Sequence, residues 1–151
     1  DGTLTEEAFA VLDVIAKYNM ILATAHISHE ETFALVRAAR ERKVERILIT
    51  HVDFPTTFYS IDEQRELVAL GAFVEHCYTT PATGKVAWEE AIAQIKAIGP
   101  SRVVLATDLG QPAAVYPDEG LEIYGNKLLE QGFSTGDLRA MLVTNPASLV
   151  E

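Results

Sequence analysis

Four side chains able to bind a metal ion or move a proton recur along the chain at nearly regular intervals. They are His26, His51, His76 and Asp108, separated by 25, 25 and 32 residues, and each follows a short apolar run. Neutral imidazole and carboxylate are suitable ligands for a borderline divalent ion, and a catalytic ion of this kind keeps one position open for water. The spacing therefore predicts a catalytic metal site, provided that the fold brings these residues together.

His26, His51 and Asp108 are the predicted metal ligands. A bound divalent ion lowers the pKa of its water toward neutrality, and Asp108 is predicted to take the proton from that water as the general base. Zinc is the expected metal, with manganese, iron and nickel as alternatives. Taken alone, each histidine is more simply a polar loop residue, and Asp108 a cap on the turn formed by Leu109 and Gly110. It is the recurrence that favours a shared site.

Other polar residues near these positions are predicted to contact the substrate or to hydrogen-bond the ligands, because metal-bound histidines usually donate their second N–H to a carboxylate or carbonyl. This set is His76, Glu75, Asp53, His29 and Gln111. For His76, a packed core histidine is an equally good interpretation. The single cysteine, Cys77, is interpreted as a small buried hydrophobic residue.

The segments between these positions predict strands that alternate with helices. The predicted strands are residues 20–25, 46–50, 71–74 and 102–107, and the predicted helices are residues 5–18, 28–42, 60–70, 88–98, 120–131 and 135–143. Ser28 with Glu31, and Ser60 with Glu63, have the spacing of a capping box. Alternation of this kind predicts a parallel sheet, whose strands all end at one edge. The strands are continuous apolar runs, which favours a sheet covered on both faces, in a barrel or a doubly wound fold.

The two longest loops are predicted to lie over the same edge of the sheet. They are residues 79–84 and 110–120. Tyr78, Lys85, Gln111 and Tyr116 are candidates to shape a pocket for a small-molecule substrate there, because a long loop in a compact domain is more often functional than not.

Length and composition set outer limits on function. The chain has 151 residues, the size of one domain, and a net charge of −10. This charge argues against a nucleic acid or an anionic membrane as the main partner, because both would repel it. One cysteine excludes an internal disulfide, and neither a signal peptide nor an apolar membrane span is visible, so a cytoplasmic location is expected.

At these positions the sequence resembles the amidohydrolase superfamily of metal-dependent hydrolases. The matching segments are residues 23–26 with 28–31, 49–53, 106–110 and 144–147. The resemblance implies a TIM-type (β/α) barrel, of which the four strands here would be strands five to eight. It also implies that His26, His51 and Asp108 match the metal ligands on strands five, six and eight. Within the superfamily the chain is most similar to an uncharacterised group of predicted hydrolases, which does not identify a substrate.

The sequence departs from the family pattern in two places. It contains no His-x-His pair, which the family carries on its first strand, and no counterpart of the bridging residue on strand four. Both would lie upstream of Asp1, so we expect either a fragment of a longer protein or a site that has lost half of its ligands. A half barrel exposes two sheet edges. We therefore expect it to associate with a missing N-terminal half or to form a homo-oligomer, and to be inactive or weakly active alone.

Three hypotheses follow. The first is a hydrolase in which metal-activated water attacks a C–N, C–O or ester-type bond. The second is a non-catalytic α/β binding or assembly module that retains the barrel framework and binds no stoichiometric metal. The third is a doubly wound four-strand domain, which would show a reversal in the strand order.

Overall fold

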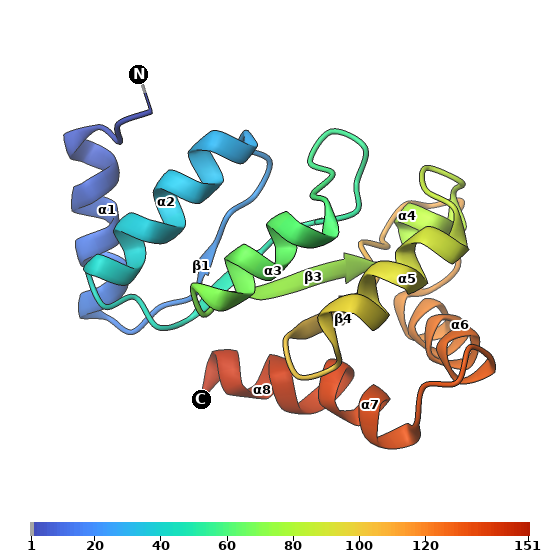
Figure 1. The fold of residues 1–151 in the computed structure, drawn as a ribbon. Coiled ribbons are helices and arrows are strands. Elements are labelled where there is room, and N and C mark those ends of the chain that lie inside the picture. Colours follow the sequence, from blue (N-terminus) through green and yellow to red (C-terminus); the bar gives the residue numbers. More distant parts are fainter. Residues whose placement is uncertain (1) are drawn as a thin grey trace.

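The computed structural model describes residues 2–151, in which strands and helices alternate along the chain (Figure 1). The elements are α1 (Glu6–Lys17), β1 (Leu22–Ala23), α2 (His29–Glu41), β2 (Ile47–Ile49), α3 (Ile61–Ala69), β3 (Phe73–Cys77), α4 (Thr79–Ala82), α5 (Trp88–Ile98), β4 (Val103–Ala106), α6 (Pro117–Glu130), α7 (Thr135–Arg139), the π-helix η1 (Ala140–Thr144) and α8 (Asn145–Val150). The predicted alternation of strands and helices is confirmed.

The four strands form one parallel sheet in the order β1-β2-β3-β4. The register places Leu22 opposite Ile47, Leu48 opposite Phe73, and Glu75 opposite Val104. The order contains no reversal, so among the described residues the sheet lacks the switch that a doubly wound domain would show. All four carboxyl ends lie at one edge of the sheet, as the sequence predicts.

Side-chain hydroxyl groups determine where several of the helices begin. The Thr5 side chain caps α1, and Ser28 and Ser60 form the predicted capping boxes with Glu31 and Glu63 at the starts of α2 and α3. These contacts satisfy N–H groups that have no partner within the helix. They also place the first turns of α2 and α3 directly after the loops that leave β1 and β2.

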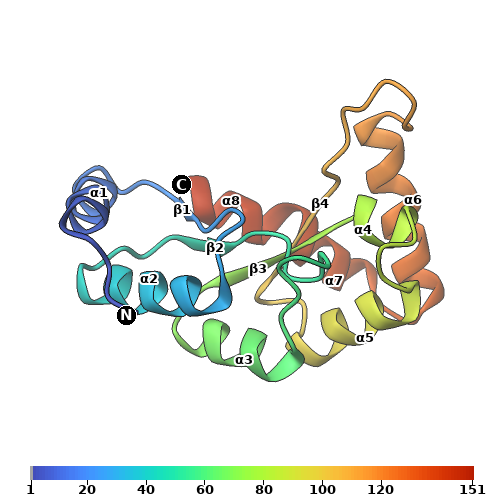
Figure 2. The same cartoon turned by 90° about the horizontal axis from the view of Figure 1, so that it is seen from above.

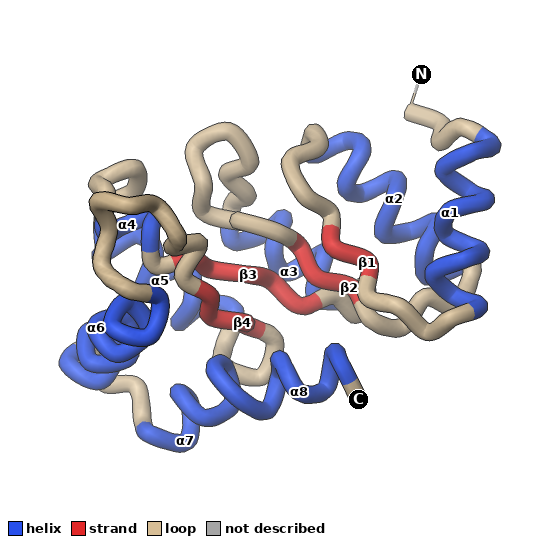
Figure 3. Tube along the Cα trace, turned by 180° about the vertical axis from the view of Figure 1, so that it is seen from behind, coloured by secondary structure: helices blue, strands red, loops and turns tan. Residues whose placement is uncertain are grey.

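Helices cover one face of the sheet. Figure 2 shows α2, α3 and α5 in a row along this face. The π-helix η1 and α8 contact β4. Figure 3 shows the opposite face, in front of which the described chain places no helix. The burial pattern agrees along residues 73–76, because Val74 and His76 are buried whereas Phe73 and Glu75 are half-buried. Cys77, at the end of β3, is buried although it lies on the same face as Glu75. The prediction of a sheet covered on both faces therefore does not hold for residues 2–151.

Several boundaries differ from the predicted ones. The first strand covers only Leu22–Ala23 and α6 begins at Pro117 instead of Gly120, and three further differences have a physical reason. The third strand continues to Cys77 instead of ending at Val74, because backbone pairing with β4 extends along Glu75, His76 and Cys77. The segment predicted as a loop from residue 79 begins with the short helix α4, where Pro81 is tolerated because it lies in the first turn. The last helix extends beyond Val143 through the π-helix η1 into α8. The wider π turn accommodates Pro146, which has no N–H to donate to the preceding turn.

The buried side chain of Asn145 joins the C-terminal helices to β4. Its Nδ2 atom donates hydrogen bonds to the carbonyl oxygens of Pro100 at 2.8 Å and Val103 at 2.7 Å. Both acceptors belong to the segment that enters β4, so this one amide fixes the start of that strand against α8. These two hydrogen bonds give Asn145 a structural role, so no catalytic role is needed to explain an asparagine at this position.

None of the helices in the described part of the chain is long and apolar enough to cross a bilayer.

We expect Asn145→Ala to lower the free energy of unfolding by about 2–3 kcal/mol, because it removes two hydrogen bonds and leaves two carbonyl groups without a partner in a buried position. Urea denaturation followed by circular dichroism measures this change. Asn126→Ala is the matched control, since Asn126 is exposed on α6, and it should alter stability by less than about 0.5 kcal/mol. Equal effects of the two substitutions would contradict the assigned role.

Candidate metal centre

Threonine side chains link the carboxyl ends of β1 and β2. The Thr50 N–H donates to Thr24 Oγ1 at 3.1 Å, and the Ala25 N–H donates to Thr50 Oγ1 at 3.2 Å. These bonds extend the pairing of the two strands beyond their last ladder residues. Because His26 follows Ala25 and His51 follows Thr50, the same bonds bring the two histidines to adjacent positions.

Left-handed backbone conformations occur at three of the strand ends. The φ angles of Ala25, His51 and Asp108 are 52°, 52° and 53°. Asn19 and Lys43 also have positive φ, but they follow the C-caps of α1 and α2, where this conformation commonly ends a helix. The three strand-end residues do not end a helix. A non-glycine residue in the left-handed conformation costs of order 1–3 kcal/mol of folding free energy. The strained residues are two of the three predicted ligands and the residue before the third.

The imidazole rings of His26 and His51 lie side by side, with centroids 5.1 Å apart and planes tilted by 36°. Two imidazoles that share one tetrahedral ion at metal–nitrogen distances of about 2.0–2.1 Å have centroids roughly 5 Å apart. The Phe54 ring lies 6.2 Å from His26 and 6.0 Å from His51. The structure thus brings together two of the predicted ligands, from strand ends 25 residues apart in sequence.

His51 also contacts two side chains of β3. Its Nδ1 atom is 3.1 Å from Cys77 Sγ and 3.5 Å from Glu75 Oε2, and its backbone N–H donates to the same Glu75 oxygen at 3.3 Å. Within residues 2–151, His51, Glu75 and Cys77 are the group whose possible ligand atoms all lie within 4.8 Å of one another. His26 and Asp108 lie outside this compact group. Imidazole nitrogen, carboxylate oxygen and thiol sulfur are all ligands that zinc accepts.

Sequence reasoning missed Cys77 as a candidate ligand. Treating Val74 as the end of the third strand hid the signal, since Glu75 and Cys77 then appeared to be loop residues. In the strand observed, side chains two residues apart point to the same face. An i, i+2 pair of Glu75 and Cys77 at a strand end, next to a strand that ends in histidine, is the pattern that would have identified it.

The Cys77 thiol lies in a negatively charged environment. Burial raises its pKa, and the carboxylates of Glu75, Asp53 and Asp108 raise it further, as does a hydrogen bond with Glu75. The side chain is 1% exposed. Without a cation the thiol is therefore protonated at neutral pH, because ionising it would add a charge beside three others.

Asp108 lies at the same edge but faces a separate hollow. Its Oδ2 atom accepts a hydrogen bond from Thr79 Oγ1 at 3.1 Å, and Gln111 Nε2 donates to its backbone oxygen at 3.3 Å. A hollow of about 410 Å³ opens beside it, lined by Thr79, Thr83, Lys85, Asp108, Leu109, Gln111, Ala113 and Ala114. The Lys85 ammonium lies 4.3 Å from the centre of the Phe54 ring. Phe54 therefore contacts Lys85 as well as the two histidines.

The segment after Asp108 is held against α6 by a glycine. A Cβ atom placed on Gly120 would lie 2.3 Å from Leu109 Cδ1 and 3.3 Å from Tyr78 Cδ1. Only a residue without a side chain lets the helix approach Leu109 this closely. The position of α6 thus supports the backbone next to Asp108.

His76 and Asp53 form a separate, fully buried pair. His76 Nδ1 lies 3.2 Å from Asp53 Oδ2, and both side chains are 0% exposed. Because His76 lies within β3, its side chain points to the face opposite that of Glu75 and Cys77. The structure therefore does not bring His76 into the His51 group. The second polar atom of each side chain, His76 Nε2 and Asp53 Oδ1, has no protein hydrogen-bond partner in the described residues.

His29 is positioned by the two capping boxes instead of by the strand ends. Its Nδ1 atom lies 2.9 Å from Glu63 Oε1, and its ring stacks on Tyr59 with centroids 4.2 Å apart. Glu63 is the residue that caps α3 with Ser60. His29 thus joins the first turns of α2 and α3, and none of these contacts involves His26 or His51.

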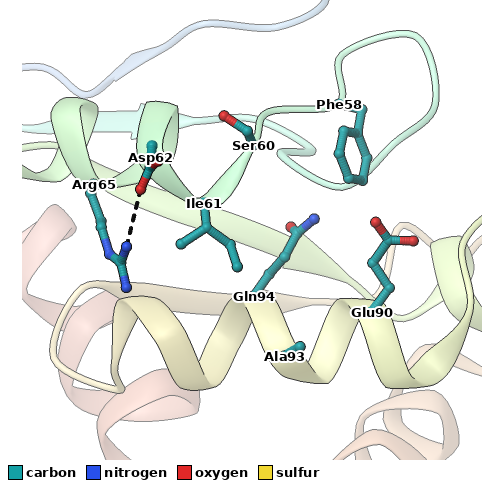
Figure 4. A pocket seen from close by; sticks show the side chains of 8 residues that line it. All are labelled: Phe58, Ser60, Ile61, Asp62, Arg65, Glu90, Ala93 and Gln94. Carbon is teal, nitrogen blue, oxygen red and sulfur yellow. Dashed lines mark hydrogen bonds and ion pairs between the residues drawn. The ribbon is translucent and has the colours of Figure 1, made fainter.

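The predicted pocket residues divide between two locations. Lys85 and Gln111 line the hollow beside Asp108, whereas Tyr78 packs against Trp88 and Tyr124, and Tyr116 is exposed. Another hollow, of about 480 Å³, lies between α3, the loop before it and α5, and none of the predicted ligands lines it (Figure 4). Arg65 pairs there with Asp62, within α3. This second hollow contains no convergent group of candidate ligands.

One protein-family model matches part of the chain. It is described as a family of unknown function (DUF6282) and matches residues 1–75, just under half of the sequence. The matched region contains His26, His51 and Glu75, and it ends before Cys77. A comparison with curated proteins finds no match.

We expect the protein to bind one zinc ion per chain, and His51→Ala or His26→Ala to weaken that binding at least about tenfold, since even the hydrogen-bond partners of a metal ligand contribute roughly 10- to 100-fold. Isothermal titration with zinc chloride measures the affinity. His29→Ala is the control, because that imidazole pairs with Glu63, and its affinity should equal that of the unmodified protein. A loss for His29→Ala as large as that for His51→Ala would contradict the assignment.

Proposed function

We propose that this protein is a metal-dependent hydrolase of the amidohydrolase type, in which metal-activated water attacks a C–N, C–O or ester-type bond. One observation carries the proposal: the strand-end histidines His26 and His51 lie with ring centroids 5.1 Å apart, and His51 also contacts a carboxylate and a thiol. Two imidazoles at this separation suit one borderline divalent ion, and zinc is the proposed metal.

We also propose that the sheet is a segment of a (β/α) barrel, as the resemblance of the sequence implies. Three features support this. The strands are parallel and in sequential order, α2, α3 and α5 cover one face, and the described chain leaves the other face without a helix (Figure 3). In a barrel the uncovered face becomes the interior, and ligands bind at the carboxyl ends of the strands. The candidate centre lies at those ends.

The chain's own residues would divide the chemistry as follows. His26 and His51 hold the ion, which supplies a water of lowered pKa. Asp108 is the proposed general base, and the amidohydrolase pattern makes it a further ligand as well. Thr79 donates to Asp108 Oδ2, which leaves the second carboxylate oxygen to accept the proton. A positioned base of this kind contributes roughly 10²–10⁴-fold to the rate.

The proposed substrate is a small molecule bound in the hollow beside Asp108. A volume of about 410 Å³ is within the range of small-ligand sites. Thr79 and Gln111 offer hydrogen-bonding groups there, Lys85 offers a cation, and Leu109, Ala113 and Ala114 offer an apolar wall. This combination suits a compact, partly polar substrate that carries an acyl group.

We expect the zinc-loaded protein to hydrolyse p-nitrophenyl acetate slowly, as a half barrel with an incomplete ligand set would, and Asp108→Asn to lower this kcat at least about 100-fold because the amide cannot accept the proton. Absorbance of released p-nitrophenol measures turnover, and elemental analysis measures retained zinc. Asp118→Asn on the exposed first turn of α6 is the control, and it should leave kcat unchanged. Normal turnover by Asp108→Asn would exclude Asp108 as the base. Failure of the unmodified protein to bind any divalent metal would favour a non-catalytic binding or assembly module.

A further inference from the structure

We propose that Cys77 and Glu75 are ligands of the same cation as His51, so that the centre contains a metal–thiolate bond and Asp108 acts as the base alone. The inference deepens the proposed function and rests on the cation that it requires. It differs from the amidohydrolase pattern in the ligands assigned to the ion. Both new ligands come from one strand, at positions i and i+2 of β3.

The separations between the three side chains support shared coordination. Tetrahedral zinc with metal–ligand distances of about 2.0–2.3 Å places neighbouring nitrogen, oxygen and sulfur ligands roughly 3.4–3.6 Å apart. His51 Nδ1 lies 3.5 Å from Glu75 Oε2, which already fits, and 3.1 Å from Cys77 Sγ. Opening the nitrogen–sulfur pair by about half an ångström, well within a side-chain rotation, would bring this pair to the same spacing. The possible ligand atoms of Glu75 and Cys77 lie within 4.8 Å of one another.

The surroundings of Cys77 are unlike those of a hydrophobic core cysteine. Its sulfur meets an imidazole nitrogen at 3.1 Å and forms a hydrogen bond with Glu75, although the side chain is almost completely buried. A buried thiol that only fills space would meet apolar groups. Here the polar partners of the thiol are themselves possible ligands, from β3 and from the end of β2.

The charge distribution also calls for a cation. Two carboxylates lie at this edge of the sheet, those of Asp108 and of Glu75, and Glu75 Oε2 is 3.5 Å from His51 Nδ1. Glu75 and His51 are largely buried, with side chains 15% and 13% exposed. Buried negative charge is costly unless a cation or hydrogen bonds offset it. A divalent ion between His51, Glu75 and Cys77 would offset the carboxylates and stabilise the thiolate together.

The ligand set also selects the class of metal. Thiolate favours zinc, cadmium and cobalt over magnesium, calcium and manganese, which prefer oxygen ligands. Three protein ligands are the number that catalytic zinc sites use. With His26 as a fourth ligand, the water would take a fifth position, a coordination number that catalytic zinc can reach. Asp108 is then free to accept a proton on the carboxylate oxygen that does not accept the hydrogen bond from Thr79.

Cobalt(II) tests the proposal directly, because a cobalt–thiolate bond produces a charge-transfer band in the near ultraviolet and Cys77 is the single cysteine of the sequence. We expect the band when the unmodified protein is titrated with cobalt chloride. Cys77→Ser should abolish the band and weaken zinc binding at least about tenfold, and Glu75→Gln should weaken zinc binding as well. Asp118→Asn, on the exposed first turn of α6, is the matched control and should keep both the band and the affinity. Asp108→Asn should also keep the band if Asp108 is the base alone, and a loss of zinc affinity in that variant would make Asp108 a ligand.

A second measurement needs no variant, so it stands even where Cys77→Ser fails to fold. X-ray absorption of the zinc-loaded unmodified protein should show one sulfur neighbour at about 2.3 Å. Metal that binds without a charge-transfer band and without a sulfur neighbour would overturn the thiolate assignment while leaving the proposed hydrolase intact. A protein that binds neither cobalt nor zinc would overturn both.

Discussion

The hydrogen bonds that hold four parallel strands in register at their carboxyl ends are the constraint on which the rest of the structure depends. Thr24 and Thr50 extend the pairing of β1 and β2 past the last ladder residues, and β3 pairs with β4 as far as Cys77. The polar residues that follow or end each strand therefore lie at the same edge of the sheet. Without this register, His51 would not meet the side chains of β3.

Several features that destabilise a folded protein occur together at this edge of the sheet. Three non-glycine residues adopt left-handed backbone conformations there, and carboxylates gather around a buried thiol. Conformational strain and uncompensated charge persist when the surrounding structure enforces them, and they cluster at functional sites. The starts of α2 and α3 have no such cost, because capping boxes satisfy their N–H groups, and apolar residues of both helices pack in the core.

Two histidines that resemble each other in sequence have different environments. His51 follows its strand and turns toward Glu75 and Cys77, whereas His76 lies within its strand and pairs with Asp53 on the helix-covered face. Neighbouring side chains of a strand point to opposite faces of the sheet. His76 therefore points away from the face on which Glu75 and Cys77 meet His51. A difference of three residues in the end of the third strand is therefore enough to hide the contact between Cys77 and His51 from a reading of the sequence.

The sequence alone determined the alternation of strands and helices, the starts of α2 and α3, and the grouping of His26 with His51. These features follow from local signals: apolar runs, capping residues and the rule that parallel strands end at one edge. Only the tertiary structure decided that Glu75 and Cys77 meet His51, because that contact depends on how far backbone pairing with β4 extends. Strand ends are set by pairing between distant segments, and no local pattern of residues encodes that pairing.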